Sequence, residues 1–200
     1  MYIVKLWCVF LYMRSAGASV STTFEPGARD MQSQLMMAAR LGRVDHAQYV
    51  IGLGADVNRP TRLGFTPIMV AAGMGHLHVV EFLIAMGADV NQPSPNGYTA
   101  ILAAAGFGDV RMVDTLIRNG AHVNMALTNG YNPIMAAVKT GKLEMVQLFV
   151  NAGASVDVEA QAGKSPMDVA RERLANDPQS GEYAEIVEAM EKAISGPVLK

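Results

Sequence analysis

The sequence predicts an all-α fold that is built from a row of similar two-helix units. Two short phrases recur along the 200-residue chain, and successive copies of each are 33 residues apart. The first phrase, Gly-Ala-x-Val-Asn or a close variant, begins at Gly54, Gly87, Gly120 and Gly153. The second, which opens on a hydroxyl or amide residue, begins at Ser33, Thr66, Thr99, Asn132 and Ser165. A fixed period of this length indicates a solenoid, in which each unit contacts only its neighbours.

The second phrase predicts where the first helix of each unit begins. Serine, threonine and asparagine cap helices, because a side-chain oxygen accepts a hydrogen bond from an unpaired backbone N–H. Pro67, Pro133 and Pro166 follow at the first helical position, where the missing N–H is harmless. We therefore expect five first helices in register, with Ser33 as a degenerate first cap.

Small residues predict how these first helices pack and where they end. Alanines occupy residues 38–39, 71–72, 103–105 and 136–137, and such small side chains let helices of adjacent units approach closely. Glycine then recurs at the same period, at Gly42, Gly75, Gly108 and Gly141. Because glycine tolerates the left-handed conformation that ends many helices, we expect each first helix to stop there.

Larger apolar residues predict a second helix in each unit. Val79, Val80 and Leu83 show the three- and four-residue spacing of one buried helix face. The glycine of the first phrase ends this helix, and the Asp or Asn residues after it suit a turn because they bond their own backbone. Asn96-Gly97 and Asn129-Gly130 then signal a short β-hairpin. Each unit is predicted to be helix, turn, helix and hairpin.

The fifth unit departs from this pattern. The glycine after its first helix is missing, and eight extra residues precede the segment that aligns with the other second helices. The end unit of a solenoid is expected to be more polar, because its outer face meets water. The charged residues that fit such a cap are Glu172, Arg173, Glu182, Glu185, Glu188, Glu191 and Lys192.

Both phrases resemble the ankyrin repeat, whose period is 33 residues and whose signature contains T-P-L-H-x-A. On this resemblance, residues 1–30 are an N-terminal extension, residues 31–194 are the ankyrin repeat domain, and residues 195–200 are a tail. The units fall at about 31–60, 61–93, 94–126, 127–159 and 160–194, the last an atypical cap. The resemblance implies a non-catalytic protein that binds a partner protein through its hairpin tips and the inner helices of a concave face.

The histidine of that signature is replaced in every unit. The replacements are Met36, Met69, Leu102, Met135 and Asp168. Methionines at one repeat position allow either a soft-metal site for Cu(I) or apolar filler of a core, and we favour the filler. His76 and His78 form an H-x-H pair, but a spacing of two on a helix points the rings to different faces. We interpret them as helix-start and surface histidines rather than as metal ligands.

Composition argues against several function classes. The formal net charge is −2 and the basic residues are scattered, so we expect no nucleic-acid partner. Cys8 is the single cysteine, which excludes a disulfide framework or thiolate zinc site within one chain. Gly73-Met74-Gly75 and Gly106-Phe107-Gly108 lack the third glycine of a dinucleotide-binding loop. We expect no enzyme, no cofactor and no metal site.

Residues 1–30 match no repeat position, and three interpretations of them stay open. Residues 1–18 form a secretory signal that is cleaved at Ala16-Gly17-Ala18, or the segment is a disordered extension, or translation starts at Met31. The apolar stretch is too short for an ordinary membrane span. A signal would make the protein secreted or periplasmic; without one we expect it in the cytoplasm.

Two rows of residues are candidate partner contacts. The hairpin row is Phe65, Tyr98 and Tyr131, and the helix row is Leu41, Met74 and Phe107, just before the first-helix glycines. The hairpin row either contacts a partner or packs locally. Phe107 is flanked by two glycines, and packing within the fold explains this large apolar side chain less well than it explains the hairpin row. Phe107 is therefore the stronger candidate. Arg62 and Lys139 are candidates for polar contacts at the rim.

These observations favour a monomeric protein-interaction module. One alternative is an exported accessory or regulatory protein of an envelope enzyme or toxin system, which requires residues 1–18 to be a signal. Another is a protein that binds a metal or small molecule through the methionine positions.

Overall fold

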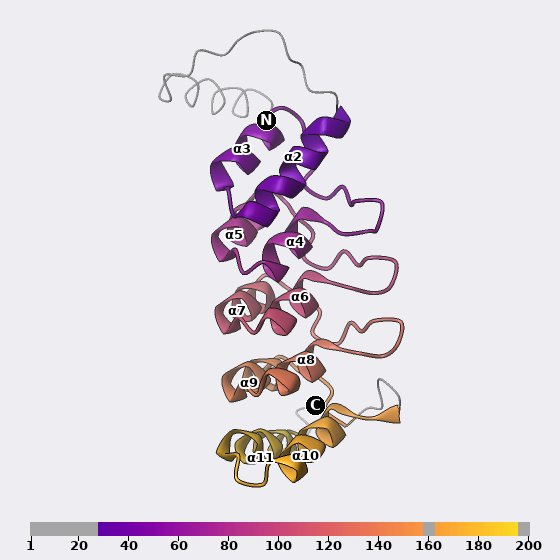
Figure 1. Ribbon diagram of the computed structural model, residues 1–200, viewed down its shortest axis with the longest axis vertical. Helices are drawn as coiled ribbons and strands as arrows, with labels where there is room; N and C mark the ends of the chain where they lie inside the picture. Colours follow the sequence, from indigo (N-terminus) through magenta and orange to yellow (C-terminus); the bar gives the residue numbers. More distant parts are fainter. Residues whose placement is uncertain (1–27, 158–162, 196–200) are drawn as a thin grey trace.

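The protein is an elongated stack of helix pairs, as its computed structural model shows for residues 28–157 and 163–195 (Figure 1). The first helices are α2 (Ala28–Leu41), α4 (Pro67–Gly73), α6 (Ala100–Phe107), α8 (Pro133–Thr140) and α10 (Pro166–Asn176). The second helices are α3 (Val44–Gly52), α5 (Leu77–Ala85), α7 (Val110–Arg118), α9 (Leu143–Asn151) and α11 (Gly181–Ser195). The loops between units project on the side of the first helices (Figure 1).

Four of the five predicted helix starts are confirmed. The side chains of Thr66, Thr99, Asn132 and Ser165 each accept a hydrogen bond from the backbone N–H three residues on. Proline occupies the first turn in α4, α8 and α10, as its fixed backbone angle favours. At α10 the Asp168 carboxylate also accepts from the backbone of Ser165, which completes a capping box.

The predicted cap at Ser33 is wrong. Helix α2 begins at Ala28 in the described residues and runs through Ser33 without a break. The reason is local: no proline follows Ser33, and no glycine turn precedes it as one precedes the other caps. The expected domain boundary at residue 31 therefore falls inside a helix. The signal-peptide and extension interpretations concern residues that lie almost entirely outside the described part of the chain.

Alanines form the contact layer between successive first helices. Ala38, Ala71, Ala104 and Ala137 are each buried, and they stand at the same position in four units. Helix α4 packs on α2 and α6, and α8 packs on α6 and α10. The larger predicted residues of the second helices, such as Val79, Leu83 and Leu116, are also fully buried. No unit has a core of its own, because each buries its apolar face against a neighbour.

The loops between units close as hairpin turns. The N–H of Ser94 donates to the carbonyl of Tyr98 at 2.9 Å, and the N–H of Gly97 donates to the carbonyl of Ser94 at 2.8 Å. The loops at 59–66 and 125–132 repeat both bonds. Gly97 has a φ of +84°, so the predicted Asn-Gly turn is confirmed.

An asparagine side chain joins neighbouring units at each of the first three junctions. The Nδ2 of Asn91 donates to the carbonyl of Gly120 at 2.8 Å, and its Oδ1 accepts from the N–H of His122 at 2.7 Å. Asn58 and Asn124 make the same pair of bonds at the junctions before and after. The sequence indicated only a local turn here. That turn is present, since Asp89 accepts from the N–H of Asn91, but the inter-unit bonds were missed.

The fifth unit is atypical, as predicted. Helix α10 has 11 residues and α11 has 15, whereas the other second helices have 9. The predicted cap residues are all exposed. Ion pairs join Arg171 to Glu191 and Lys192 to Glu188 on this polar end.

None of the helices in residues 28–157 and 163–195 combines the length and the apolar character that crossing a membrane requires.

Replacing Asn91 with alanine should lower the free energy of unfolding by about 2 kcal/mol, because it leaves a donor and an acceptor of the next unit without partners. Urea unfolding followed by circular dichroism measures this change. Asn151→Ala, at an exposed position on α9, is the control and should change the midpoint little. An equal effect of the two substitutions would mean that the bridge between units is not stabilising.

Candidate binding surface

The predicted helix row is exposed and lies at equivalent positions in three successive units. Leu41, Met74 and Phe107 are 54%, 49% and 57% exposed, at or next to the C-terminal ends of α2, α4 and α6. Large apolar side chains that expose half their surface on neighbouring elements often mark an interaction site. We call these three residues the helix row.

The structure also gives Phe107 a packing role, which corrects the expectation that it has little structural reason to exist. A Cβ atom at Gly75 would lie 2.5 Å from Cε1 of Phe107, so the ring covers the glycine of the preceding unit. His76 covers Gly42 in the same way, with its Nδ1 2.8 Å from such a Cβ. These glycines therefore supply both a positive φ and room for the next unit.

His76 and His78 both reach back to the preceding unit, which corrects their assignment to different faces. The Nε2 of His76 lies 3.0 Å from the carbonyl of Arg40, and the Nε2 of His78 lies 2.9 Å from the carbonyl of Gly42. His76 is the N-cap residue of α5 and does not follow helical geometry, so the two rings lie only 6.0 Å apart. They close the end of α2.

The hairpin row is half-buried and packs locally. Phe65 meets Tyr98 edge to face, with ring centroids 5.7 Å apart and an angle of 71° between the planes. The Nζ of Lys139 stands 4.4 Å from the ring centroid of Tyr131. That contact joins a hairpin residue to a residue of α8 in the fourth unit.

Lys139 has glycine at the equivalent positions of the two preceding units, Gly73 and Gly106. Neither glycine has a positive φ. A Cβ at Gly106 would meet nothing within 4 Å, and a Cβ at Gly73 would make only an ordinary contact at 3.7 Å with Ala103. The fold itself does not require glycine at either position.

The first hairpin carries a residue that the sequence reasoning missed. Leu63 is 75% exposed, the highest value among the large apolar side chains with a described environment. It stands where the next two hairpins have Asn96 and Asn129. This replacement of asparagine by leucine could have identified Leu63 from the sequence. Arg62 beside it is exposed and lines a cavity of about 460 Å³ that also includes Met36 of α2 and Arg59.

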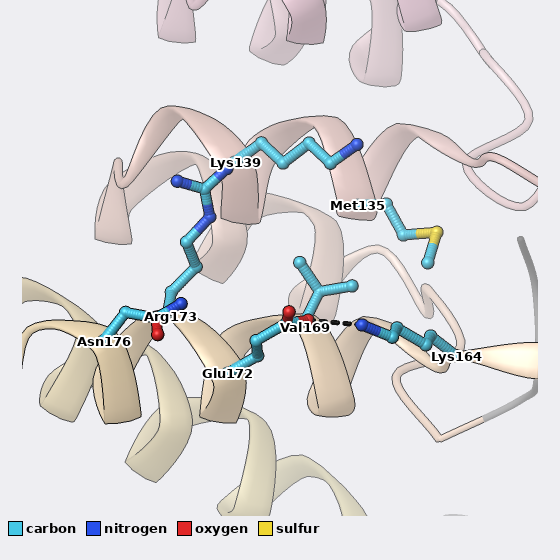
Figure 2. A pocket seen from close by; sticks show the side chains of 7 residues that line it. All are labelled: Met135, Lys139, Lys164, Val169, Glu172, Arg173 and Asn176. Carbon is cyan, nitrogen blue, oxygen red and sulfur yellow. Dashed lines mark hydrogen bonds and ion pairs between the residues drawn. The ribbon is translucent and has the colours of Figure 1, made fainter. Parts of the chain in front are cut away.

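A second cavity lies between α8 and α10, at the other end of the stack (Figure 2). It has a volume of about 370 Å³, and Met135 and Val169 supply apolar lining. Lys139 extends along α8, Arg173 rises from α10 toward that helix, and Lys164 enters from the hairpin side (Figure 2). Lys164 pairs with Glu172 at 2.6 Å. This hydrogen bond, together with the charge of Lys164, lowers the pKa of the Glu172 carboxyl.

Comparison with protein families decides what this stack is. A family model described as ankyrin repeats (3 copies) matches residues 7–94, 35–126 and 101–186. The chain belongs to the ankyrin repeat family. A comparison with curated proteins gives no match.

Ankyrin repeats are generally protein–protein interaction modules and are typically non-catalytic. In this ankyrin repeat protein, the residue that replaces the signature histidine is part of the core in the second, third and fourth units. Met69 and Met135 are each 2% exposed, and Leu102 is 3% exposed. These three residues are apolar filler, as expected, whereas Met36 is only partly buried and Asp168 is exposed. Within the described residues, no group of three or more His, Cys, Asp or Glu side chains is placed to hold a metal ion.

Burial of the hairpin row predicts a dependence of stability on pH. Burial raises the pKa of the Tyr98 phenol above its ordinary value of about 10, so the folded state favours the neutral form. The resulting stabilisation is complete below about pH 10 and is lost as the pH rises through the raised pKa. Tyr98→Phe keeps the ring, as Phe65 does in the preceding unit, but has no proton to lose.

The free energy of unfolding of Tyr98→Phe should therefore fall less steeply than that of the unchanged protein between about pH 9 and pH 11. Urea titrations at these two pH values measure the difference. Identical losses in the two proteins would mean that the phenol of Tyr98 is solvated in the folded state.

Proposed function

We propose that this ankyrin repeat protein is a non-catalytic, monomeric module that binds one partner protein through its hairpin side. The observation that carries the proposal is the helix row, in which three successive units expose a large apolar side chain at one position. Phe65 and Tyr98 supply the adjacent hairpin wall, and Leu63 adds an apolar tip. Arg62 and Lys139 stand as polar contacts at the two ends.

The glycines of α4 and α6 support this location. In the fourth unit the Lys139 side chain lies against Tyr131 and covers its ring. In the second and third units the equivalent residues are Gly73 and Gly106, so no side chain covers Phe65 or Tyr98 from that position. Glycine lowers helix stability by up to about 1 kcal/mol relative to other residues. Because the fold does not require it there, close approach of a partner explains it best.

The central residues of the surface are expected to dominate the affinity. Aromatic and large apolar anchors often contribute 2 kcal/mol or more, which is about thirtyfold in affinity. Phe107 and Met74 flank the two glycines in sequence and stand at the centre of the stack. The packing of Phe107 on Gly75 fixes its ring in place, which reduces the entropy lost on binding.

A photo-crosslinking residue tests where the partner lies. Placed at position 74 in cells that naturally produce the protein, it should attach one partner, which mass spectrometry then identifies. The same residue at position 111, exposed on the outer helix α7, should not attach that partner. A partner attached only from position 111 would move the binding surface to the outer helices.

Gly106→Lys separates folding from binding on the same surface. The new side chain would cover Tyr98 as Lys139 covers Tyr131, so cross-linking from position 74 should be abolished. The free energy of unfolding should stay unchanged or rise by up to about 1 kcal/mol, because lysine favours helix more than glycine does. Asn151→Lys adds the same charge on the outer helix α9 and should leave cross-linking intact. Full cross-linking by a folded Gly106→Lys protein would refute the proposed surface.

A further inference from the structure

The binding surface changes character along the stack. The position held by Leu41, Met74 and Phe107 is Thr140 in the fourth unit and Arg173 in the fifth. The surface therefore runs from apolar at its start and centre to cationic at its C-terminal end. That end coincides with the cavity between α8 and α10, which Lys139 lines from α8 and Arg173 lines from α10 (Figure 2).

The charges of this cavity do not balance. Its lining contains three cations, Lys139, Lys164 and Arg173, and one carboxylate, Glu172. Glu172 is occupied by Lys164. Among residues 28–157 and 163–195, no carboxylate pairs with Lys139 or Arg173 at ion-pair distance. Among the described residues, Arg173 thus has no ion-pair partner beside a recess of about 370 Å³ that Met135 and Val169 also line, and the ammonium of Lys139 lies over the Tyr131 ring.

We propose that this cavity binds an aspartate or glutamate side chain of the partner protein, next to the part of the partner that covers Met74 and Phe107. The inference rests on the proposed function, since it adds a polar end to the same surface. The planar guanidinium of Arg173 can hold a carboxylate by two hydrogen bonds, and Lys139 adds positive charge to the same lining.

A carboxylate suits the cavity better than a phosphate group. Glu172 lies within the lining, and its negative charge repels a doubly charged phosphate more than a singly charged carboxylate. A nucleic-acid backbone is disfavoured as well, because it carries a negative charge on every nucleotide and would bring several of them near Glu182, Glu185 and Glu188 of α11, whereas a protein segment can present a single carboxylate. The partner segment is therefore expected to be acidic protein.

Selection from a library of random peptides, displayed to the full-length protein, tests this inference without a known partner. Selected peptides that lose affinity for Gly106→Lys are those bound at the hairpin side. We expect them to contain aromatic or large apolar residues followed or preceded by aspartate or glutamate. In synthetic copies, replacing the acidic residues with their amides should weaken binding about tenfold.

Charge reversal locates the acidic contact. Arg173→Glu should weaken the selected acidic peptides about tenfold, and copies with lysine in place of the acidic residues should bind this variant better than the unchanged protein. Lys139→Gln provides a second, milder variant. Arg111→Glu on the outer helix α7 makes the same charge change as Arg173→Glu and should leave the affinity unchanged. Circular dichroism confirms that each variant is folded.

The outcomes separate this inference from the proposed function. Hairpin-side peptides without acidic residues, or with equal affinity for Arg173→Glu, overturn the acidic contact and leave the proposed function standing. Peptides whose affinity is unchanged by Gly106→Lys but reduced by Arg173→Glu overturn the proposed surface and support binding at the cavity. A synthetic copy with phosphoserine that binds well, beside a glutamate copy that binds no better than its amide, assigns the cavity to phosphate and overturns the carboxylate proposal.

Discussion

Close contact between successive first helices is the constraint on which the rest of this structure depends. Each unit is too small to enclose a core, so its alanines must touch the neighbouring helix directly. Ala72 and Ala104 are fully buried at that contact. The contact fixes the direction of every other side chain on the helix. It points the residues of the helix row toward solvent, in register, from one unit to the next.

Much of the fold was predictable because each structural position of the unit occurs several times in the sequence. A single Thr-Pro pair is a weak signal, but the same cap at Thr66, Thr99, Asn132 and Ser165 fixes both the helix starts and the period. Ser33 shows the limit of this reasoning. It stands at the right spacing, but without a preceding turn or a following proline nothing ends the helix that arrives from Ala28.

Contacts between units were less predictable than the units themselves. Asn91 was identified as a turn residue, and the turn is present, but its amide also bridges to residues 29 and 31 positions further on. His76 and Phe107 likewise lie over glycines of the preceding unit. The period reveals that such residues recur, but not which atoms they meet. Of the residues in the proposed binding surface, the helix row and Lys139 were predicted from the sequence, whereas Leu63 and the cation-rich lining of the cavity came from the structure.

The asparagine bridge bears on how an array of this kind changes length over evolution. Each bridge spans the same 29 residues from its amide to a glycine carbonyl, whichever units it joins. A gene duplication that adds 33 codons therefore adds an asparagine that can bond to the next unit and a glycine that can accept the bond from the preceding unit. The series stops where Asp157 replaces asparagine, because a carboxylate has no N–H to donate. The junction between the fourth and fifth units therefore lacks the side-chain nitrogen that donates at the three earlier junctions, although α10 and α11 still pack on α8 and α9.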